Sequence, residues 1–408
     1  MAQKDKPVKD VSATEMLHNI ESATGLRLRF DSLAQRIVVD LGNGKHRIFN
    51  DGDLTAVYNF CRENAPILEH KAYKNLHAID CAIASVRVSR SFNPLKEYLN
   101  NCLLKYNGKP ADYFSEMVSH IELGDETEVQ FLYRWLHGVL GRVQYNHQND
   151  MLIMKGKQGI GKSSFFLELM KNIKDFYMDE DVNLYDKDQV LYLGTKLIWV
   201  LEEFGTVLKS SDRNKVKAFL TKEQIEKRQA YAKFASKFER VCSHAGTTND
   251  EEFLTDLTGN RRYLIVRLLK IDLEWFQESF NPDLLWGQVY ANLCEHGVKI
   301  CKLTAEEQAA KEEGNESNMI SDPLAELMAS WFDMDPDGTV YSTEIEDKIR
   351  VSGKSNVSWY KVADILAKIG ARRGRIGHKQ KRGYLGIAWK ANQAPAAEED
   401  NVRYFKPR

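Results

Sequence analysis

The chain has 408 residues, with 57 basic and 58 acidic residues and a formal net charge of −1, a length that accommodates about two to four domains. The apolar share of 43% excludes wholesale disorder, and the balanced charge means that any affinity for nucleic acid must come from local patches. The six cysteines are scattered and form no C-x-x-C pair, which argues against a zinc site or a disulfide framework and favours buried thiols in a reducing compartment.

Membrane and export signals are missing from the sequence pattern. No apolar stretch is long enough to span a bilayer, and no signal peptide follows the polar residues 1–10. We therefore expect a soluble, cytoplasmic protein without a membrane partner.

The first 147 residues predict a small domain followed by helices. Residues 1 to about 20 are expected to be a loose tail. Apolar clusters at 26–30 and 36–41 predict a β-hairpin, and helical spacing after Asp51 predicts a helix. We expect residues 1–92 to form a small α+β N-terminal domain and residues 93–147 a helical lead-in or collar, which begins with Pro94 in a first helical turn.

The segment 156–163 fits the phosphate-binding P-loop pattern G-x-x-x-x-G-K-[ST] at every fixed position. Residues 151–154 predict a buried strand before it and 164–170 a helix after it, which is where a phosphate cradle must lie. Lys162 would reach the β- and γ-phosphates of ATP and Ser163 would bind Mg²⁺; the alternative is a chance glycine-rich turn. The predicted nucleotide-binding residues are Gly156, Gln158, Gly159, Ile160, Gly161, Lys162, Ser163 and Ser164.

Hydrolysis needs acidic and polar groups beyond this loop. Glu202 and Glu203 follow a predicted buried strand, 197–201; Glu202 would help to hold Mg²⁺ and Glu203 would act as general base. P-loop ATPases usually carry Asp-Glu at this place, so the Glu-Glu pair assigns the metal-binding and general-base roles less securely. The alternative to a catalytic pair is two glutamates that are simply solvated. Asn249 follows a third strand and would orient the attacking water, although asparagine also favours plain turns.

Two adjacent arginines, Arg261 and Arg262, precede a fourth strand at 264–266. They are either surface charge or an arginine finger offered to a neighbouring subunit's nucleotide, an interaction that contributes about 10³–10⁵ in rate. Strands that alternate with helices over 148–300 predict an α/β core with a mainly parallel sheet.

A basic segment interleaved with aromatic residues lies between the acidic pair and Asn249, within 222–240. This mixture suits single-stranded DNA, because cations follow phosphates and rings stack on bases; a solvated charged face is the alternative. The predicted contacts are Lys227, Arg228, Tyr231, Lys233 and Lys237.

The C-terminal residues predict a linker at 301–320, whose charged stretch 305–318 is either a linker or an exposed helix. A winged-helix domain is expected at 321–390 and a flexible tail at 391–408. One helix is expected from Leu324 to Phe332, two more at 343–349 and 359–369, and then two short strands. A basic wing suits duplex DNA, with a protein-contact module as the alternative. Its predicted contacts are Arg372, Arg373, Arg375, Lys379, Lys381 and Arg382.

The P-loop, the segment 199–203, the run 246–249 and the run 253–262 together resemble the virulence-associated E family, superfamily 3-type helicases of phages, plasmids and pathogenicity islands. The resemblance covers residues 25 to 270, and its most specific part is the Thr-Gly-Asn-Arg-Arg run combined with Gly-Thr-Thr-Asn. It implies an AAA+-like core, a hexameric ring, ATP-driven translocation on one DNA strand, and Arg261 or Arg262 as a finger acting in trans. It also implies a DNA-gripping pore hairpin around 231–237. The winged helix lies outside the strongest match; it could recognise an origin, load the ring or contact host replication proteins.

Three functions remain open on the sequence: a replicative DNA helicase, a P-loop enzyme such as a small-molecule kinase, and an ATP-switched DNA-binding regulator. The expected fold is α/β, with a P-loop AAA+-like core and parallel sheet, a small α+β N-terminal domain and a C-terminal winged helix. A kinase would need a substrate lid and no basic hairpin, whereas a regulator would bind duplex DNA without separating its strands.

Overall fold

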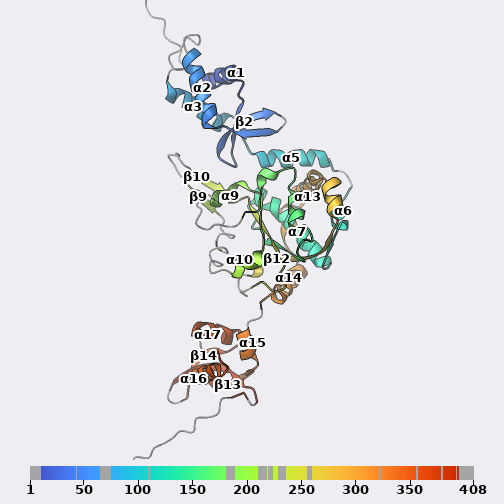
Figure 1. Ribbon diagram of the computed structural model, residues 1–408, viewed down its shortest axis with the longest axis vertical. Coiled ribbons are helices and arrows are strands. Elements are labelled where there is room, and N and C mark those ends of the chain that lie inside the picture. Colours follow the sequence, from blue (N-terminus) through green and yellow to red (C-terminus); the bar gives the residue numbers. More distant parts are fainter. Residues whose placement is uncertain are drawn as a thin grey trace, which may run out of the picture. The chain divides into compact units, whose positions relative to one another are not determined.

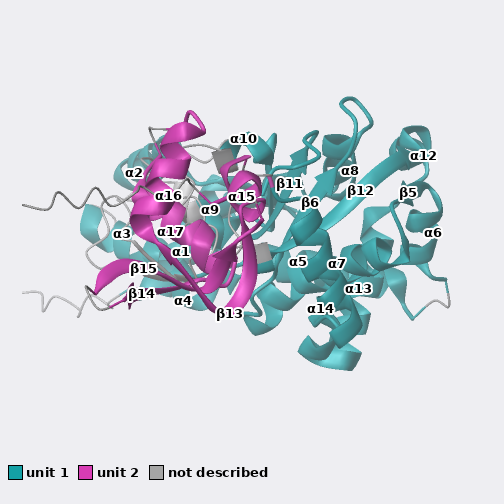
Figure 2. Cartoon of the chain, turned by 90° about the horizontal axis from the view of Figure 1, so that it is seen from below, with its two compact units in different colours: residues 1–319 teal, residues 320–408 magenta. Residues whose placement is uncertain are grey.

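The computed structural model describes residues 11–42, 44–64, 75–108, 111–180, 189–209, 218, 224–227, 236–254, 260–320, 323–354, 357–377, 380–391 and 393–394. The chain forms two compact units, Met1–Met319 and Ile320–Arg408 (Figure 2). Within the described residues, no helix is long and apolar enough to cross a membrane. All six cysteines are free thiols; Cys81 and Cys294 are exposed, contrary to the prediction, and the other four are buried.

Unit 1 begins with a helix and a small sheet. Helix α1 (Ala13–Thr24) is capped by Ser12 and buries Met16, Leu17 and Ile20, so the prediction of a loose tail is wrong for these residues. The predicted hairpin is present as β1 (Leu28–Asp31) and β2 (Arg36–Gly42), with β3 (Lys45–Ile48) and β4 (Ser91–Phe92) completing the sheet order β3-β2-β1-β4. Helices α2 (Asp51–Asn64), α3 (Leu76–Ala84) and α4 (Val86–Ser89) complete this mixed α/β segment.

A six-stranded sheet forms the centre of unit 1, in the order β5-β12-β6-β11-β8-β7 (Figure 1). Its strands are β5 (Ile121–Leu123), β6 (Met151–Lys155), β7 (Tyr177–Met178), β8 (Ile198–Leu201), β11 (Ser243–Thr248) and β12 (Tyr263–Ile271). Every pair is parallel except β5 with β12. Strands β6, β8 and β11 are buried along their whole length, as expected of a parallel sheet covered on both faces. The predicted parallel sheet is confirmed.

Helices pack around this sheet (Figure 1). They are α5 (Pro94–Tyr106), α6 (Tyr113–Ser119), α7 (Glu126–Tyr145), α8 (Lys162–Leu169), α9 (Gln189–Thr195), α10 (Phe204–Lys209), α12 (Leu273–Glu278), α13 (Pro282–His296) and α14 (Ala305–Ser317), with short 3-10 turns η2 (Lys174–Phe176), η3 (Asn260–Arg262) and η4 (Gly297–Cys301). The buried Trp135 of α7 donates from Nε1 to the carbonyl of His244 in β11, 3.2 Å away, which fixes α7 on the sheet. The apolar spacing in 126–145 therefore marks a helix that covers the sheet.

The segment predicted as a linker contains helix α14, which belongs to unit 1. Glu307, Lys311 and Asn315 are buried on it. The ammonium of Lys311 lies 2.6 Å from Asp150 Oδ2, and Asn315 Nδ2 donates to the carbonyl of Tyr263 at 3.3 Å. The charged composition misled the prediction because these polar side chains are satisfied against the core instead of by solvent.

Unit 2 has the order α15 (Pro323–Ala329), β13 (Phe332–Tyr341), α16 (Ser342–Val351), α17 (Trp359–Lys368), β14 (Arg372–Ile376) and β15 (Lys381–Trp389). The strands form an antiparallel sheet in the order β13-β15-β14. The predicted helix through Phe332 is wrong, because α15 ends at Ala329 and Phe332 pairs with Trp389. Strand β13 escaped prediction because its Asp-Pro-Asp-Gly run indicates a turn; it is an edge strand with an irregular register, where proline is tolerated.

Candidate active site

The glycine-rich loop joins the end of β6 at Lys155 to the start of α8 at Lys162. Gly159 and Gly161 have φ angles of +77° and +108°, in the left-handed region that favours glycine. A Cβ on Gly156 would lie 2.5 Å from the carbonyl oxygen of Leu268 in β12. At these three positions the path of the loop requires glycine, and the loop begins in direct contact with the neighbouring strand.

Lys162 lies at the centre of this loop. Its side chain is buried, and its Nζ donates to the carbonyls of Gly156 (2.7 Å) and Lys157 (2.8 Å) and to Asn249 Oδ1 (2.6 Å). Burial lowers the pKa of the Lys162 ammonium. Two residues predicted separately from the sequence are therefore in direct contact, although they follow different strands.

The end of β11 is also tied to the loop. The N–H of Gly156 donates to the carbonyl of Thr248 at 3.2 Å, and the parallel register places Thr248 beside Lys155. The carboxyl ends of β6 and β11 therefore meet at one edge of the sheet, with Asn249 immediately beyond it.

Glu202 and Glu203 lie at this same edge. Both side chains are exposed directly after β8, and Leu201 of β8 pairs with Gly246 of β11. Glu203 has a φ of +47°, a conformation that side-chain-bearing residues adopt at a cost and that often marks functional positions. The first turn of α10, which follows Glu203, is close to the Asn249 segment, because a Cβ added at Gly205 would lie 2.5 Å from Asp250 Oδ2.

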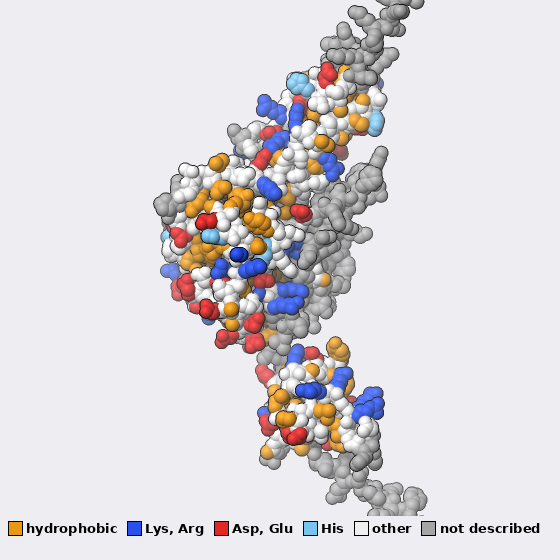
Figure 3. All heavy atoms as spheres, turned by 180° about the vertical axis from the view of Figure 1, so that it is seen from behind, with side chains coloured by type: hydrophobic (Ala, Val, Ile, Leu, Met, Phe, Trp, Pro, Cys, Tyr) orange, Lys and Arg blue, Asp and Glu red, His pale blue; other side chains and the backbone are white. Residues whose placement is uncertain are grey.

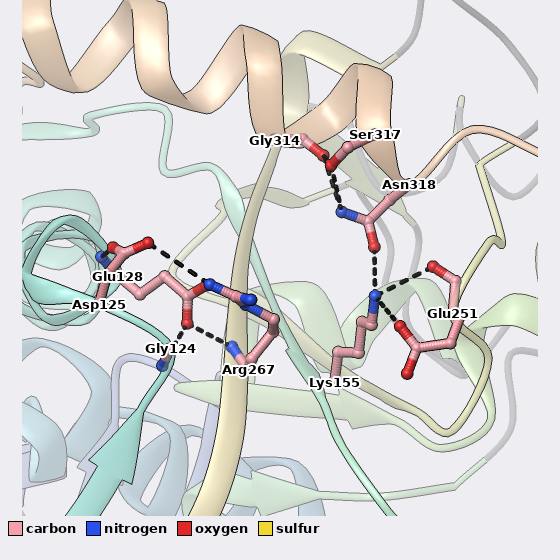
Figure 4. Close-up of polar contacts among 9 residues, drawn as sticks. All are labelled: Gly124, Asp125, Glu128, Lys155, Glu251, Arg267, Gly314, Ser317 and Asn318. Atoms are coloured by element: carbon pink, nitrogen blue, oxygen red, sulfur yellow. Dashed lines mark hydrogen bonds and ion pairs between the residues drawn. The ribbon is translucent and has the colours of Figure 1, made fainter.

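Lys155 anchors the segment that follows Asn249 (Figure 4). Its buried ammonium donates to the Glu251 carbonyl (3.1 Å) and to Asn318 Oδ1 (2.9 Å), and lies 2.5 Å from Glu251 Oε2. The N–H groups of Phe253 and Leu254 both donate to the Asn318 carbonyl at 3.0 Å. No motif in the sequence predicts this network; the available signal is a lysine at the end of a buried apolar strand.

A second ion pair fixes β12 to the start of α7 (Figure 4). Buried Glu128 accepts from the N–H of Gly124 (2.9 Å), the N–H of Arg267 (2.6 Å) and Arg267 Nε (2.7 Å). The glutamate thus satisfies two backbone donors and pairs with a guanidinium beside the strand that supports the glycine-rich loop.

Arg261 and Arg262 lie at the opposite edge of the sheet. They form η3 just before β12, whose first residue Tyr263 pairs with Met151, the first residue of β6. Arg261 is exposed and Arg262 is half-buried. The length of β6 separates this edge from the start of the glycine-rich loop, about 13 Å at the rise of a β-strand. The structure therefore does not bring the arginine pair to the loop of its own chain.

The predicted basic hairpin is an antiparallel pair, β9 (Gln224–Lys227) and β10 (Ser236–Glu239). Lys227 is opposite Ser236, and Lys237 is opposite Glu226. Arg228, Tyr231 and Lys233 lie outside the described residues.

The predicted basic residues of unit 2 lie on two paired strands. Arg372, Arg373 and Arg375 are on β14, Lys381 and Arg382 are on β15, and all five are exposed; Lys379 lies outside the described residues. Arg375 is directly opposite Arg382, and such like-charged pairs are unfavourable without an anion. Lys and Arg side chains gather along one side of unit 2 in Figure 3.

Among the residues that the structure describes, no group of three or more His, Cys, Asp or Glu side chains is arranged to hold a metal ion.

Comparisons with known proteins identify a family. The model of the virulence-associated protein E-like domain matches residues 100–320. The chain is similar to three apo structures of the NrS-1 C-terminal region, with 15% sequence identity and TM-scores of 0.44–0.45. The matches cover 91–92% of this chain and 98–100% of those chains. A comparison with curated proteins finds no match.

Proposed function

The chain belongs to the virulence-associated protein E-like family, and we propose that it is an ATP-dependent DNA helicase of a mobile genetic element. The observation that carries this proposal is the contact between Lys162 Nζ and Asn249 Oδ1 at 2.6 Å. It joins a glycine-rich phosphate loop to a polar residue from the neighbouring parallel strand, with the acidic pair after β8 at the same edge. This set of groups is what NTP hydrolysis needs.

The residues of the loop fit ATP and Mg²⁺. The glycine conformations at Gly159 and Gly161 free backbone N–H groups for an anion, and the following helix offers its N-terminus. The Lys162 ammonium donates hydrogen bonds to three oxygen atoms, and a phosphate oxygen would replace one of these acceptors. Ser163 and Glu202 would hold the metal ion.

The roles of the remaining groups follow from their positions. ATP would supply the phosphoanhydride bond whose hydrolysis drives movement. Glu203, exposed at the strand end, would accept the proton of the attacking water, and Asn249 would orient that water while remaining in contact with Lys162. The left-handed backbone of Glu203 would aim its carboxylate away from the path of the strand.

The arginine pair supports a shared site. Arg261 and Arg262 lie at the sheet edge opposite to the glycine-rich loop, so a subunit could use them only at a neighbour's nucleotide. We expect a closed ring, with the hexamer of superfamily 3-type helicases as the expected size. Mixing Arg261→Ala or Arg262→Ala protein with Lys162→Ala protein should restore part of the ATPase at mixed interfaces; no restoration in either mixture would contradict the shared site.

DNA would be contacted by two basic elements. The β9–β10 hairpin would grip one strand, as in the pore of a ring helicase. The order α15-β13-α16-α17-β14-β15 in unit 2 supports a winged-helix fold, and its exposed arginines would bind duplex DNA. Host replication proteins would be further partners of this unit.

The decisive test is unwinding of a forked duplex by the full chain, with Lys162→Ala as the inactive control. We expect strand separation that requires ATP, Mg²⁺ and Lys162. ATP hydrolysis without strand separation, at either fork polarity and over a range of salt, would defeat the helicase proposal while leaving the NTPase proposal intact.

One observation favours a second candidate. Unit 2 is a separate compact unit whose β14–β15 strands carry exposed, mutually opposed arginines, which is typical of a duplex-binding module. An ATP-switched DNA-binding regulator or loader would bind duplex DNA tightly without unwinding it. A nucleotide-dependent change in duplex affinity, with an intact fork after ATP hydrolysis, would support this function.

A further inference from the structure

Unit 1 contains a cleft of about 1050 Å³. The cleft is lined by residues of β1, β2 and β3, of the start of α5, of the segment 171–176 and of the end of α9. Strand β1 pairs with β4, which leads directly into α5, and Arg29 Nη2 lies 2.5 Å from Glu97 Oε1 of α5. These contacts tie the small sheet to α5, which also lines the cleft.

The cleft is distinct from the candidate active site. Residues 171–176 follow the C-terminal end of α8, whereas the glycine-rich loop precedes the N-terminal end of the same helix. Eight helical residues separate the two ends, about 12 Å at the rise of an α-helix. A ligand of the cleft would therefore not occupy the nucleotide position.

The charge of the cleft is unbalanced. Six lysines and arginines line it, against three acidic residues. Two of the three carboxylates are already engaged: Asp31 accepts from the N–H groups of Leu33 and Ala34 at 2.9 Å, and Glu97 pairs with Arg29. The third, Asp175, is exposed.

Several cleft cations have little competition from carboxylates. Arg36 Nε lies 4.0 Å from Asp31 Oδ2. Lys196 is less free, because its Nζ donates to the carbonyl of Asp175 at 2.8 Å and the negative charges of Asp175 and Glu180 act on it. Within the described part of the chain, no carboxylate forms an ion pair with Lys45 or Lys174, and both are exposed. Arg36, Lys45 and Lys174 are available to an anion that enters the cleft, and Lys196 adds to the positive charge of the lining.

Apolar and aromatic surface lies between these cations. Leu41 and Ile48 are 58% and 51% exposed, and Phe176 and Tyr192 are half-buried where they line the cleft. Phosphates with accessible base faces match this mixture, whereas a duplex would present phosphates and leave the apolar side chains without a partner. A single strand is the ligand that satisfies both kinds of surface.

We propose that this cleft binds a segment of single-stranded nucleic acid, with Arg36, Lys45 and Lys174 holding phosphates and the aromatic and aliphatic side chains contacting bases. Helix α9, whose end lines the cleft, packs against β9 of the basic hairpin. The cleft therefore extends the predicted strand-gripping element instead of duplicating it. This inference rests on the proposed action on DNA and is independent of nucleotide hydrolysis.

The test is binding of a fluorescent oligodeoxythymidine to the full chain, measured by anisotropy over a range of salt. The double variant Lys45→Glu, Lys174→Glu should weaken binding about tenfold and reduce the slope of log K against log salt by about 1.4, which corresponds to two lost phosphate contacts on a single strand. The control is Lys270→Glu with Lys299→Glu, which changes the total charge equally at exposed positions outside the cleft. Equal losses in the two double variants would overturn the proposal.

Two further readouts make the result specific. A photoreactive thymidine analogue in the oligonucleotide should crosslink to the peptides that contain Phe176 and Tyr192, and this should disappear in the cleft variant. Polyglutamate that displaces the oligonucleotide at equal charge concentration would indicate a site for acidic protein and would also overturn the proposal. If the cleft variant keeps its ATPase activity and binds DNA normally, the cleft proposal is overturned and the helicase proposal stands. If the wild-type chain has no ATPase activity but its DNA binding depends on the cleft, the helicase proposal is overturned and the cleft proposal stands.

Discussion

Lys155 provides a sharp test of how the candidate active site is held together. In Lys155→Met the aliphatic part of the side chain is kept and the ammonium is lost. The hydrogen bonds to the Glu251 carbonyl and Asn318 Oδ1 disappear, as does the ion pair with Glu251. The segment that follows Asn249 then loses its link to the strand that leads into the glycine-rich loop.

The magnitude follows from these contacts. Hydrogen bonds to a charged group contribute about 1.5–3 kcal/mol each, while the Glu251 side chain is 87% exposed, so its ion pair adds little. The gross loss for the two hydrogen bonds is about 3–6 kcal/mol. Two anchors remain, because Phe253 and Leu254 still donate to the Asn318 carbonyl. Because Asn249 is then held less firmly, we expect about 2 kcal/mol of the loss to appear as a higher activation free energy of ATP hydrolysis. This corresponds to about a 30-fold lower kcat.

The assay is steady-state ATP hydrolysis together with binding of a fluorescent ATP analogue. Nucleotide affinity should change less than about threefold, because the backbone donors of the glycine-rich loop are untouched. Glu251→Gln keeps the backbone carbonyl and should hydrolyse ATP nearly as fast as wild type, and Lys270→Met is the matched exposed control. A Lys155→Met protein with the wild-type kcat, or one whose whole defect lies in nucleotide binding, would refute the reasoning.

Three other variants test separate parts of unit 1. Asn249→Ala should lower single-turnover ATP hydrolysis about 10²–10³-fold while nucleotide binding persists; an unchanged rate would remove Asn249 from the site. Glu128→Ala leaves the N–H groups of Gly124 and Arg267 without their acceptor and should lower the free energy of unfolding by about 3 kcal/mol in urea titrations, whereas exposed Glu126→Ala should change it little. Burial lowers the pKa of His137 to about 4. As the pH falls, the unfolded chain therefore takes up a proton at this residue before the folded chain does. The contribution of neutral His137 to the free energy of unfolding is complete above pH 6.5 and falls by up to about 3 kcal/mol as the pH drops to 4. His137→Gln should flatten this dependence, and an unaltered pH profile of unfolding would contradict it.

The sequence predicted the elements whose signals are local. The buried strands β6, β8, β11 and β12 were found from apolar runs with turns at their ends, and the glycine-rich loop from a fixed spacing. Helix α1 was missed because its apolar residues face a core built by distant segments. Strand β13 was missed because its partner β15 supplies the hydrogen bonds that its own composition does not predict.

The candidate site was predictable residue by residue but not as an assembly. Lys162 and Asn249 each carried a motif, yet their contact depends on β11 lying beside β6, which no local pattern states. Lys155 carried no motif at all. Its partners are 96 and 163 residues away along the chain, so only the tertiary structure shows what the lysine does.

The parallel sheet also separates two groups that the sequence places close together. Asn249 and Arg262 are 13 residues apart, yet Asn249 follows the carboxyl end of β11 and Arg262 precedes the amino end of β12. Both strands flank β6 in parallel, so a rigid strand length of about 13 Å lies between them. If the arginines act on nucleotide, ATPase activity must be lost on dilution below the concentration at which subunits associate. Activity per subunit that stays constant in a monomer would leave the glycine-rich loop functional and assign the arginines to another role.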